Sequence, residues 1–322
     1  MTICGIESLV YGVEDLELCG RFFEDWGLEC IERGERSSRW ALPDRTTVVL
    51  RPIDDPSLPP PLVSGSTVRE TVWGVDSEQS LKAVAAELSK DRKVVQSDDG
   101  TVHAVDDIGY AMGFRITARE PVSTRLPDTN TVGRVSRTDT RAATAFPYRV
   151  RPQRFVHVVY WIPRDMERAA RFYVERLGFC VTESVAGSGY FLRCGPRSDH
   201  HNLFLNCRGD NFGFQHVAFE VRDIDEVMMF GQYMERQGWK SHLGPGRHVV
   251  GSNVYWYFWC PAGGCAEIGC DIDFITDHWQ PLRHPSMTAG GSAWFVRPED
   301  EGLRPGHGDW PQFGGWGNPE KP

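Results

Sequence analysis

The chain repeats itself, and this repeat limits its fold more than any other feature of the sequence. Residues 8–29, SLVYGVEDLELCGRFFEDWGLE, match residues 157–179, HVVYWIPRDMERAARFYVERLGF, at an offset of about 150 residues. Each segment has an apolar strand-like run, a turn with an aspartate, a helical stretch and a glycine directly after it. This order predicts a strand and a helix that ends at a glycine C-cap.

A second unit follows each of these segments. Residues 71–91 and 215–239 each run from an apolar strand through an Asp-bearing turn into an amphipathic helix, and strand-like stretches come after both. We therefore predict an α+β fold with four βαβββ modules, paired into two domains. The border lies in a Thr- and Arg-rich stretch with several prolines. The expected parts are an N-terminal domain at 1–147, a C-terminal domain at 148–278 and a C-terminal arm at 279–322.

The overall composition is that of a soluble globular protein. The chain has 322 residues, of which 40% are apolar and 25% charged, and it has no apolar run near the roughly 18 residues that a membrane helix needs. The N-terminus lacks the basic region of a signal peptide. We therefore expect a cytoplasmic protein without a membrane partner.

The charge pattern argues against a nucleic-acid partner. Lys and Arg number 35 against 44 Asp and Glu, a net charge of −9, which repels a phosphate backbone. Arginines do cluster between Arg115 and Arg154. This segment is either an anion-binding strip or a connector that pairs with the acidic body, and solvated charge runs of the second kind are more common.

The nine cysteines do not predict a disulfide framework or a zinc site. They are odd in number, scattered and without a CxxC pair. Cys260, Cys265 and Cys270 are separated by four residues each, and no second ligand pair accompanies them. We expect these cysteines to be small buried apolar residues.

The arm at 279–322 leaves two interpretations open. It is rich in proline and glycine, which favours disorder, but it also contains Trp294, Trp310 and Trp316, which favour packing on a surface.

Three polar residues within apolar strand-like runs are candidate metal ligands. His157 lies in RFVHVVYW, His216 in FGFQHVAFEV and Glu267 in GGCAEIG. The two histidines occupy nearly the same position in their modules, so pairing of the modules would bring them face to face. A lone buried histidine is usually a core residue with a backbone partner. Two such histidines with a buried glutamate instead indicate the facial triad of non-haem Fe(II) oxygenases, because burying a carboxylate without a cation is costly.

At these residues the C-terminal half resembles the type I extradiol ring-cleaving dioxygenases of the vicinal oxygen chelate superfamily, which includes the glyoxalases. The similarity lies at His157, at HVAF beginning with His216, at GPGRH ending with His248, and at YFWCPAGGCAE from Tyr257 to Glu267. The resemblance implies curved mixed sheets that enclose a cavity. It further implies a metal-free N-terminal half, with Ser8, Val72 and Gly113 near the positions of the ligands.

The resemblance also implies a reaction and a set of roles. The enzyme would cleave the ring of a catechol with O2 beside the diol, giving a hydroxymuconic semialdehyde type of product. His157, His216 and Glu267 would bind Fe(II), or Mn(II) as the alternative ion. His201, with a pKa near neutrality, would be the acid and base, while His248 and Tyr257 would hold the substrate oxygens. His200 stands beside His201, and we choose His201 because it lies fifteen residues before His216. Relatives suggest a homo-oligomer of four or more subunits.

Two positions depart from the family pattern. Cys260 replaces the Asp that usually precedes the turn proline, and Val159 stands where some relatives have Asn. The substrate itself stays open, because Arg193, Arg247 and Arg283 would suit a carboxylate whereas Trp161, Phe191 and Phe258 would suit an apolar ring.

Two other functions compete with ring cleavage. A glyoxalase- or isomerase-like metalloenzyme would use the same ligands without O2, but it leaves His201, His248 and Tyr257 without a role. A binding protein of the bleomycin-resistance type would form the same cavity without a metal. Oxygen uptake and metal analysis separate these alternatives, since the fold alone does not.

Overall fold

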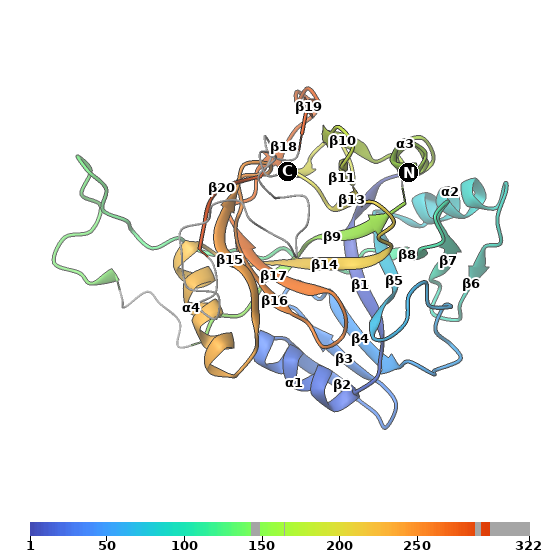
Figure 1. The fold of residues 1–322 in the computed structure, drawn as a ribbon, viewed down its shortest axis with the longest axis horizontal. Coiled ribbons are helices and arrows are strands. Elements are labelled where there is room, and N and C mark those ends of the chain that lie inside the picture. The colour runs from blue at the N-terminus through green and yellow to red at the C-terminus, as the bar shows by residue number, and fades with distance from the viewer. Residues whose placement is uncertain (143–148, 164, 287–290, 297–322) are drawn as a thin grey trace.

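The computed structural model describes residues 1–142, 149–163, 165–286 and 291–296. The chain forms four consecutive modules, each a strand, a helix and three further strands, and they build one mixed sheet in each half (Figure 1). The predicted α+β class and its four βαβββ modules are confirmed. The predicted border at residues 147 and 148 lies outside the described residues.

The two N-terminal modules have the same order of elements. The first consists of β1 (Ile3–Val13), α1 (Leu16–Trp26), β2 (Glu29–Arg33), β3 (Ser38–Ala41) and β4 (Thr47–Pro52). The second consists of β5 (Thr67–Val75), α2 (Glu78–Leu88), β6 (Val95–Gln96), β7 (Val102–Val105) and β8 (Ala111–Ile116).

The two C-terminal modules repeat this order with small additions. The third consists of β9 (Arg154–Ile162), α3 (Met166–Arg171), the π-helical turn η2 (Phe172–Arg176), β10 (Cys180–Val185), β11 (Gly189–Arg193), the short β12 (Ser198–Asp199) and β13 (Leu203–Cys207). The fourth consists of β14 (Gly213–Glu220), α4 (Ile224–Arg236), β15 (Ser241–His248), β16 (Val254–Trp259) and β17 (Cys265–Cys270).

In each half the two modules join through their first strands. β1 pairs with β5, and β9 pairs with β14, both antiparallel. Within each module the first strand pairs in parallel with the last, as β14 does with β17. Each sheet is therefore mixed and has an approximate twofold arrangement of modules, which places the strands β9, β14 and β17 side by side at its centre.

The helices begin where the sequence predicts. Asp15, Asp165 and Asp223 are N-caps whose side chains accept backbone N–H groups, while Ser77 takes this role before α2. Gly27 ends α1 with a φ of 99°, a backbone conformation that favours glycine. No helix in the described ranges combines the length and the apolar character that crossing a membrane requires.

Buried aromatic side chains join the two halves. Trp26 of α1 contacts Phe230 of α4 at a ring-centroid distance of 4.7 Å, and Phe219 and Phe258 of the same module lie within 6.0 Å of it. In the same way Trp73 of β5 lies edge-on to Phe179, which follows the third module's helix, at 5.3 Å. The apolar core is thus continuous across both halves.

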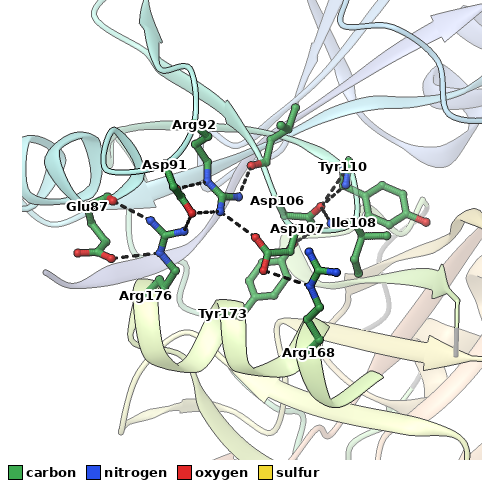
Figure 2. Close-up of polar contacts among 12 residues, drawn as sticks. Glu87, Asp91, Arg92, Asp106, Asp107, Ile108, Tyr110, Arg168, Tyr173 and Arg176 are labelled. Carbon is green, nitrogen blue, oxygen red and sulfur yellow. Dashed lines mark hydrogen bonds and ion pairs between the residues drawn. The ribbon is translucent and has the colours of Figure 1, made fainter. Parts of the chain in front are cut away.

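A polar network adds to this junction between the second and third modules (Figure 2). Arg176 of η2 reaches Glu87 and Asp91 at the end of α2, with its Nη1 2.7 Å from an Asp91 oxygen. Asp106 lies in the turn between β7 and β8 and is buried. Its carboxylate accepts three backbone N–H groups of that turn, and it also accepts the hydroxyl of Tyr173 at 2.8 Å.

The described part of the predicted arm packs on the C-terminal sheet. β19 (Leu282–His284) pairs in parallel with β10, and β20 (Ser292–Phe295) pairs with β15 at the other edge. β18 (Phe274–Ile275), directly before the arm, pairs with β12. Of the tryptophans that suggested packing, Trp294 lies in β20, whereas Trp310 and Trp316 lie outside the described residues. The Arg-rich segment after β8 leaves the body as an extended loop (Figure 1).

Candidate metal centre

Three neighbouring strands bring the predicted ligands together. His157 lies on β9, His216 on β14 and Glu267 on β17. The register places Ala218 opposite both His157 and Glu267, so these two side chains share a face of the sheet. His216, two residues before Ala218, lies on the same face and completes the group. All three side chains are buried.

The ligand atoms form a small triangle. The Nε2 atoms of His157 and His216 are 3.0 Å apart, and the Glu267 Oε2 lies 3.3 Å from the first and 3.1 Å from the second. Two adjacent ligands of an octahedral ion are separated by about 3.0 Å when each metal–ligand distance is about 2.1 Å. The separations therefore suit three ligands on one face of a divalent cation. This is the one cluster of three or more such donors in the described part of the chain.

The charge of Glu267 supports the same conclusion. The side chain is 0% exposed, and its Oε2 has no aligned hydrogen-bond donor. Burial raises the pKa of Glu267, but contacts with His157 and His216 outweigh burial and hold the pKa below its usual range. A buried, ionised carboxylate oxygen without a donor calls for a cation. The residues present thus fit a divalent metal, with positions left for other ligands.

Two polar neighbours orient these ligands, and the sequence analysis missed both. Asn253 donates from Nδ2 to the Glu267 Oε1 at 2.9 Å, which leaves Oε2 to face the histidines. The Gln215 Oε1 contacts the His216 Nδ1, and a hydrogen on Nδ1 leaves Nε2 free to bind the ion. The polar residue directly before His216 was a signal for Gln215. Asn253 gave none, because a polar residue directly before a strand is common and does not by itself indicate a partner.

His201 faces the metal ligands, and His200 does not. The ring of His201 stacks on that of His157 with centroids 4.0 Å apart and lines the cavity beside the ligands. His200 contacts Glu183 instead. We expected a pKa near neutrality for His201, and this expectation was wrong. Burial and the nearby imidazoles of His157, His200, His216 and His248 lower its pKa well below the usual value, so the ring is neutral at pH 7.

His248 and Tyr257 lie on the open side of the triangle. The His248 Nε2 is 3.1 Å from the Tyr257 hydroxyl, and Tyr257 stands directly opposite Glu267 across β16 and β17. Burial lowers the pKa of His248 to about 4. Burial and the charge of Glu267 raise the pKa of Tyr257 well above its usual value. At pH 7 the tyrosine is therefore a neutral hydrogen-bond donor and the histidine a neutral acceptor or donor.

The turn after β16 has the predicted form. Cys260 accepts the backbone N–H of Gly263 at 3.0 Å, and its own N–H donates to Gly264. Both glycines have positive φ, 112° and 65°. The thiol of Cys260 is buried and lies outside the ligand cluster. Cys260 therefore shapes the turn that returns the chain from Tyr257 to Glu267.

His157 and His216 line a cavity of about 30 Å³ whose other walls are mostly apolar. Its lining includes His157, His216, His201, His248 and Tyr257, together with Val159, Phe191, Phe204, Asn206, Gln215 and Val250. Of the residues considered for substrate binding, Phe191 lies in this wall. Arg193 instead bonds to the Val181 carbonyl and Thr182, and Arg247 pairs with Asp271. Val159 offers no hydrogen-bond donor to the cavity.

The equivalent positions in the N-terminal half carry different side chains. Ser8 stands opposite Val72, and Val72 opposite Gly113, just as Ala218 links His157 and Glu267. The equivalent of His216 is two residues before Val72, which is Glu70; our expectation of Val72 was off by two residues. Glu70 pairs with His103, with 2.7 Å between Oε1 and Nδ1. Ser8 accepts a hydrogen bond from Thr47 at 3.0 Å.

Comparison with known proteins agrees with the fold. Residues 154–261 match the family model "Glyoxalase/Bleomycin resistance protein/Dioxygenase superfamily". The whole chain has the vicinal oxygen chelate fold, as the solved structures show. It superposes on the Mn(II)-bound glyoxalase of Novosphingobium aromaticivorans with a TM-score of 0.72 at 20% identity, covering 99% of this chain and 97% of the other.

Two further proteins are similar to this chain, one in structure and one in sequence. A halotolerant catechol dioxygenase superposes with a TM-score of 0.71 at 18% identity, covering 94% of this chain and 97% of that chain. Metapyrocatechase 2 of Cupriavidus necator is 35% identical over 127 residues. That match spans 39% of this chain and 39% of the relative.

Proposed function

We propose that this protein is an extradiol dioxygenase that opens the ring of a catechol with O2. The observation that carries the proposal is the triangle of His157, His216 and Glu267, with His201, His248 and Tyr257 gathered on its open side. The likeness to catechol dioxygenases supports it. The product would be a ring-opened acid of the hydroxymuconic semialdehyde type, cleaved beside the diol.

The ion held at the triangle would be Fe(II), which supplies a template for catechol and O2 and a path for electrons between them. Mn(II) suits the same ligands, and a relative of the same fold is a Mn(II)-bound protein by its printed name.

Side chains of the protein would accept and donate the protons of the reaction. His201 is neutral and buried, so its ring nitrogen can accept the proton that a catechol hydroxyl loses on binding. Tyr257 keeps its proton at pH 7 and donates a hydrogen bond to a substrate oxygen. His248, beside Tyr257, holds the second oxygen-facing position.

The mostly apolar wall of the cavity suits an aromatic substrate. Phe191 and Phe204 stack face to face at 3.9 Å in that wall. Their apolar faces suit the ring of the substrate.

The direct test is reconstitution with Fe(II) without oxygen, followed by a panel of catechols and O2. We expect one O2 consumed per catechol and a yellow product. Bound iron without any product from any catechol would exclude ring cleavage.

The strongest competing function is that of a glyoxalase- or isomerase-like enzyme, which the superposition on a glyoxalase favours. Such an enzyme turns over without O2, so turnover of a 2-oxoaldehyde adduct under nitrogen would establish it. A metal-free binding protein would leave Glu267 buried without a cation. Metal analysis of protein purified without chelators tests that function.

We also propose a homo-oligomer of four or more subunits. Leu126, Val132 and Val135 are exposed in the extended segment between the halves, and a second subunit would cover them. Light scattering on the full chain gives the subunit number.

A further inference from the structure

A row of four titratable side chains leads from the arm to the metal cavity. The His284 Nε2 of β19 contacts the Glu183 Oε2 of β10. The other carboxylate oxygen, Oε1, lies 3.3 Å from the His200 Nε2. The His200 Nδ1 is in turn 3.0 Å from the His201 Nδ1. The row therefore ends at the ring that we propose as acid and base.

The inner members of this row are out of contact with solvent. His200 is 0% exposed, Glu183 5% and His201 4%. The backbone holds the row in place, because His200 donates its N–H to the Asp273 carbonyl at 2.7 Å and β19 pairs with β10 beside Glu183. Burying a carboxylate with imidazoles contributes little to stability compared with apolar packing. The row is therefore better explained by its effect on His201.

The protonation of the row follows from what each atom accepts. Burial raises the pKa of Glu183, but His200 and His284 outweigh burial and lower it, so the carboxylate is ionised and only accepts hydrogen bonds. The His200 Nε2 has no other acceptor among the described residues, and its contact with Glu183 is long and poorly aligned. The hydrogen on a neutral His200 ring still belongs on Nε2, because only there does it meet a negative charge.

This assignment determines which nitrogen of the His201 ring carries the hydrogen. A neutral His200 with its hydrogen on Nε2 presents a lone pair at Nδ1, so the hydrogen bond at 3.0 Å needs a hydrogen on the His201 Nδ1. The His201 Nε2 is then unprotonated, and no side chain or backbone group of the described residues is bonded to it. That nitrogen is the one left to face the cavity.

We propose that Glu183 and His200 are positioning residues that hold His201 as the Nδ1–H tautomer, with the lone pair of Nε2 directed to the substrate. This inference rests on the proposed function for its purpose, since a base needs that lone pair to take the proton of a catechol hydroxyl. His284 completes the row by binding the outer oxygen of Glu183. The arm thereby contributes to the geometry of the site.

The first test reads the tautomer directly and needs no turnover. Histidine labelled with ¹⁵N is measured in the full chain with diamagnetic Zn(II) at the metal site. We expect the His201 Nδ1 to carry the hydrogen and Nε2 to carry none. In His200→Phe, which keeps a ring but removes the acceptor, we expect the hydrogen to move to Nε2 or to divide between the two nitrogens. An Nε2–H tautomer in the unchanged protein would overturn the proposal.

The second test uses kinetics with the Fe(II) protein and a catechol. We expect His200→Phe to lower kcat by about 10- to 100-fold with little change in KM and no loss of iron, as for groups that orient a catalytic residue. His200→Asn, whose side-chain oxygen replaces the Nδ1 acceptor, should recover most of kcat. Glu183→Gln should give a smaller loss. If His200→Phe does not fold, the tautomer of His201 and kcat are both measured in Glu183→Gln instead.

A matched control lies in the other half. His103→Phe removes a partly buried histidine–glutamate pair with 2.7 Å between Nδ1 and Oε1, and should change neither the tautomer of His201 nor kcat. An unchanged kcat in His200→Phe would refute the positioning role and leave ring cleavage standing. The expected tautomers in a protein that cleaves no catechol would support the positioning role and refute the proposed function.

Discussion

The two halves of the chain have the same fold, but among the described residues only the C-terminal half brings together candidate metal ligands. In the C-terminal half the central strands carry His157, His216 and Glu267. At the same register the N-terminal half carries Ser8, Glu70 and Gly113. The backbone therefore does not make the centre. Three side chains on matching strands do.

The halves also differ in how their buried charges are satisfied. Glu70 has a direct partner in His103, and Ser8 has one in Thr47. Glu267 has two imidazoles at 3.1 and 3.3 Å, yet its Oε2 has no aligned donor. The buried carboxylate of Glu70 is thus satisfied by a protein side chain, whereas that of Glu267 is suited to a cation. Most of the variants below are compared with a control variant in the other half.

The largest effect is expected at the carboxylates. Glu267→Gln removes the charge that the ion needs, and breaking such a buried pair costs about 3 to 5 kcal/mol, or roughly 100- to 1,000-fold or more in metal affinity. Metal analysis after dialysis should find the variant empty, and oxygen uptake should cease. Glu70→Gln should keep the full metal content. Loss of metal in both variants would mean that the N-terminal half also contributes to binding.

The next effect concerns turnover without loss of metal. His201→Gln keeps the ligands but removes the base, so we expect kcat to fall by about 100-fold or more while iron content stays unchanged. The control is His103→Gln in the other half, where turnover should not change. A full kcat in His201→Gln would assign proton transfer to another group. His248 would then be the first residue to examine.

The sequence predicted the ligands because their signals are local. A histidine or glutamate inside an apolar run is conspicuous, and the repeat predicted which strands would meet. It could not predict contacts of loop residues with strand residues, such as Asn253 with Glu267 or His200 with Glu183, because these depend on how the segments approach one another in the fold. The equivalent of His216 was misplaced by two residues for a related reason. A strand of alternating side chains offers both Glu70 and Val72 on one face, and only the pairing of Ser8 with Val72 shows which of them is the equivalent of His216.

A third prediction tests whether the halves unfold together. Asp106→Ala removes the acceptor of three backbone N–H groups and of the Tyr173 hydroxyl across the junction (Figure 2). The free energy of unfolding should fall by about 2 to 3 kcal/mol, since hydrogen bonds to a buried charge are lost. Asp107→Ala beside it, whose ion pairs are partly exposed, should cost less than about 1 kcal/mol. Urea unfolding followed by fluorescence should show one transition that shifts as a whole. Two separate transitions would mean that the halves are independent.

The smallest effect concerns how the free energy of unfolding depends on pH. His103 and His248 should contribute to it with opposite signs. The contact with Glu70 raises the pKa of His103. Its contribution to stability is therefore complete below the unfolded value of about 6.5 and is lost as the pH rises through the folded pKa. The pKa of His248 is instead lowered to about 4, so the unfolded chain binds the proton first and stability falls as the pH drops from about 6.5 toward 4.

Because the signs are opposite, one kind of measurement distinguishes the contribution of His103 in the N-terminal half from that of His248 in the C-terminal half. The free energy of unfolding of the metal-free protein would be determined by urea titration between pH 5 and 8. His103→Gln should remove a gain at low pH of less than about 1 kcal/mol, because the ring is 34% exposed and solvent screens the pair. His248→Gln should remove a loss of stability at low pH. The two difference profiles should therefore slope in opposite directions. Profiles of the same sign would show that His248 is stabilised by protonation, and His248 would then be the partner of an anion in the cavity and not a neutral neighbour of Tyr257.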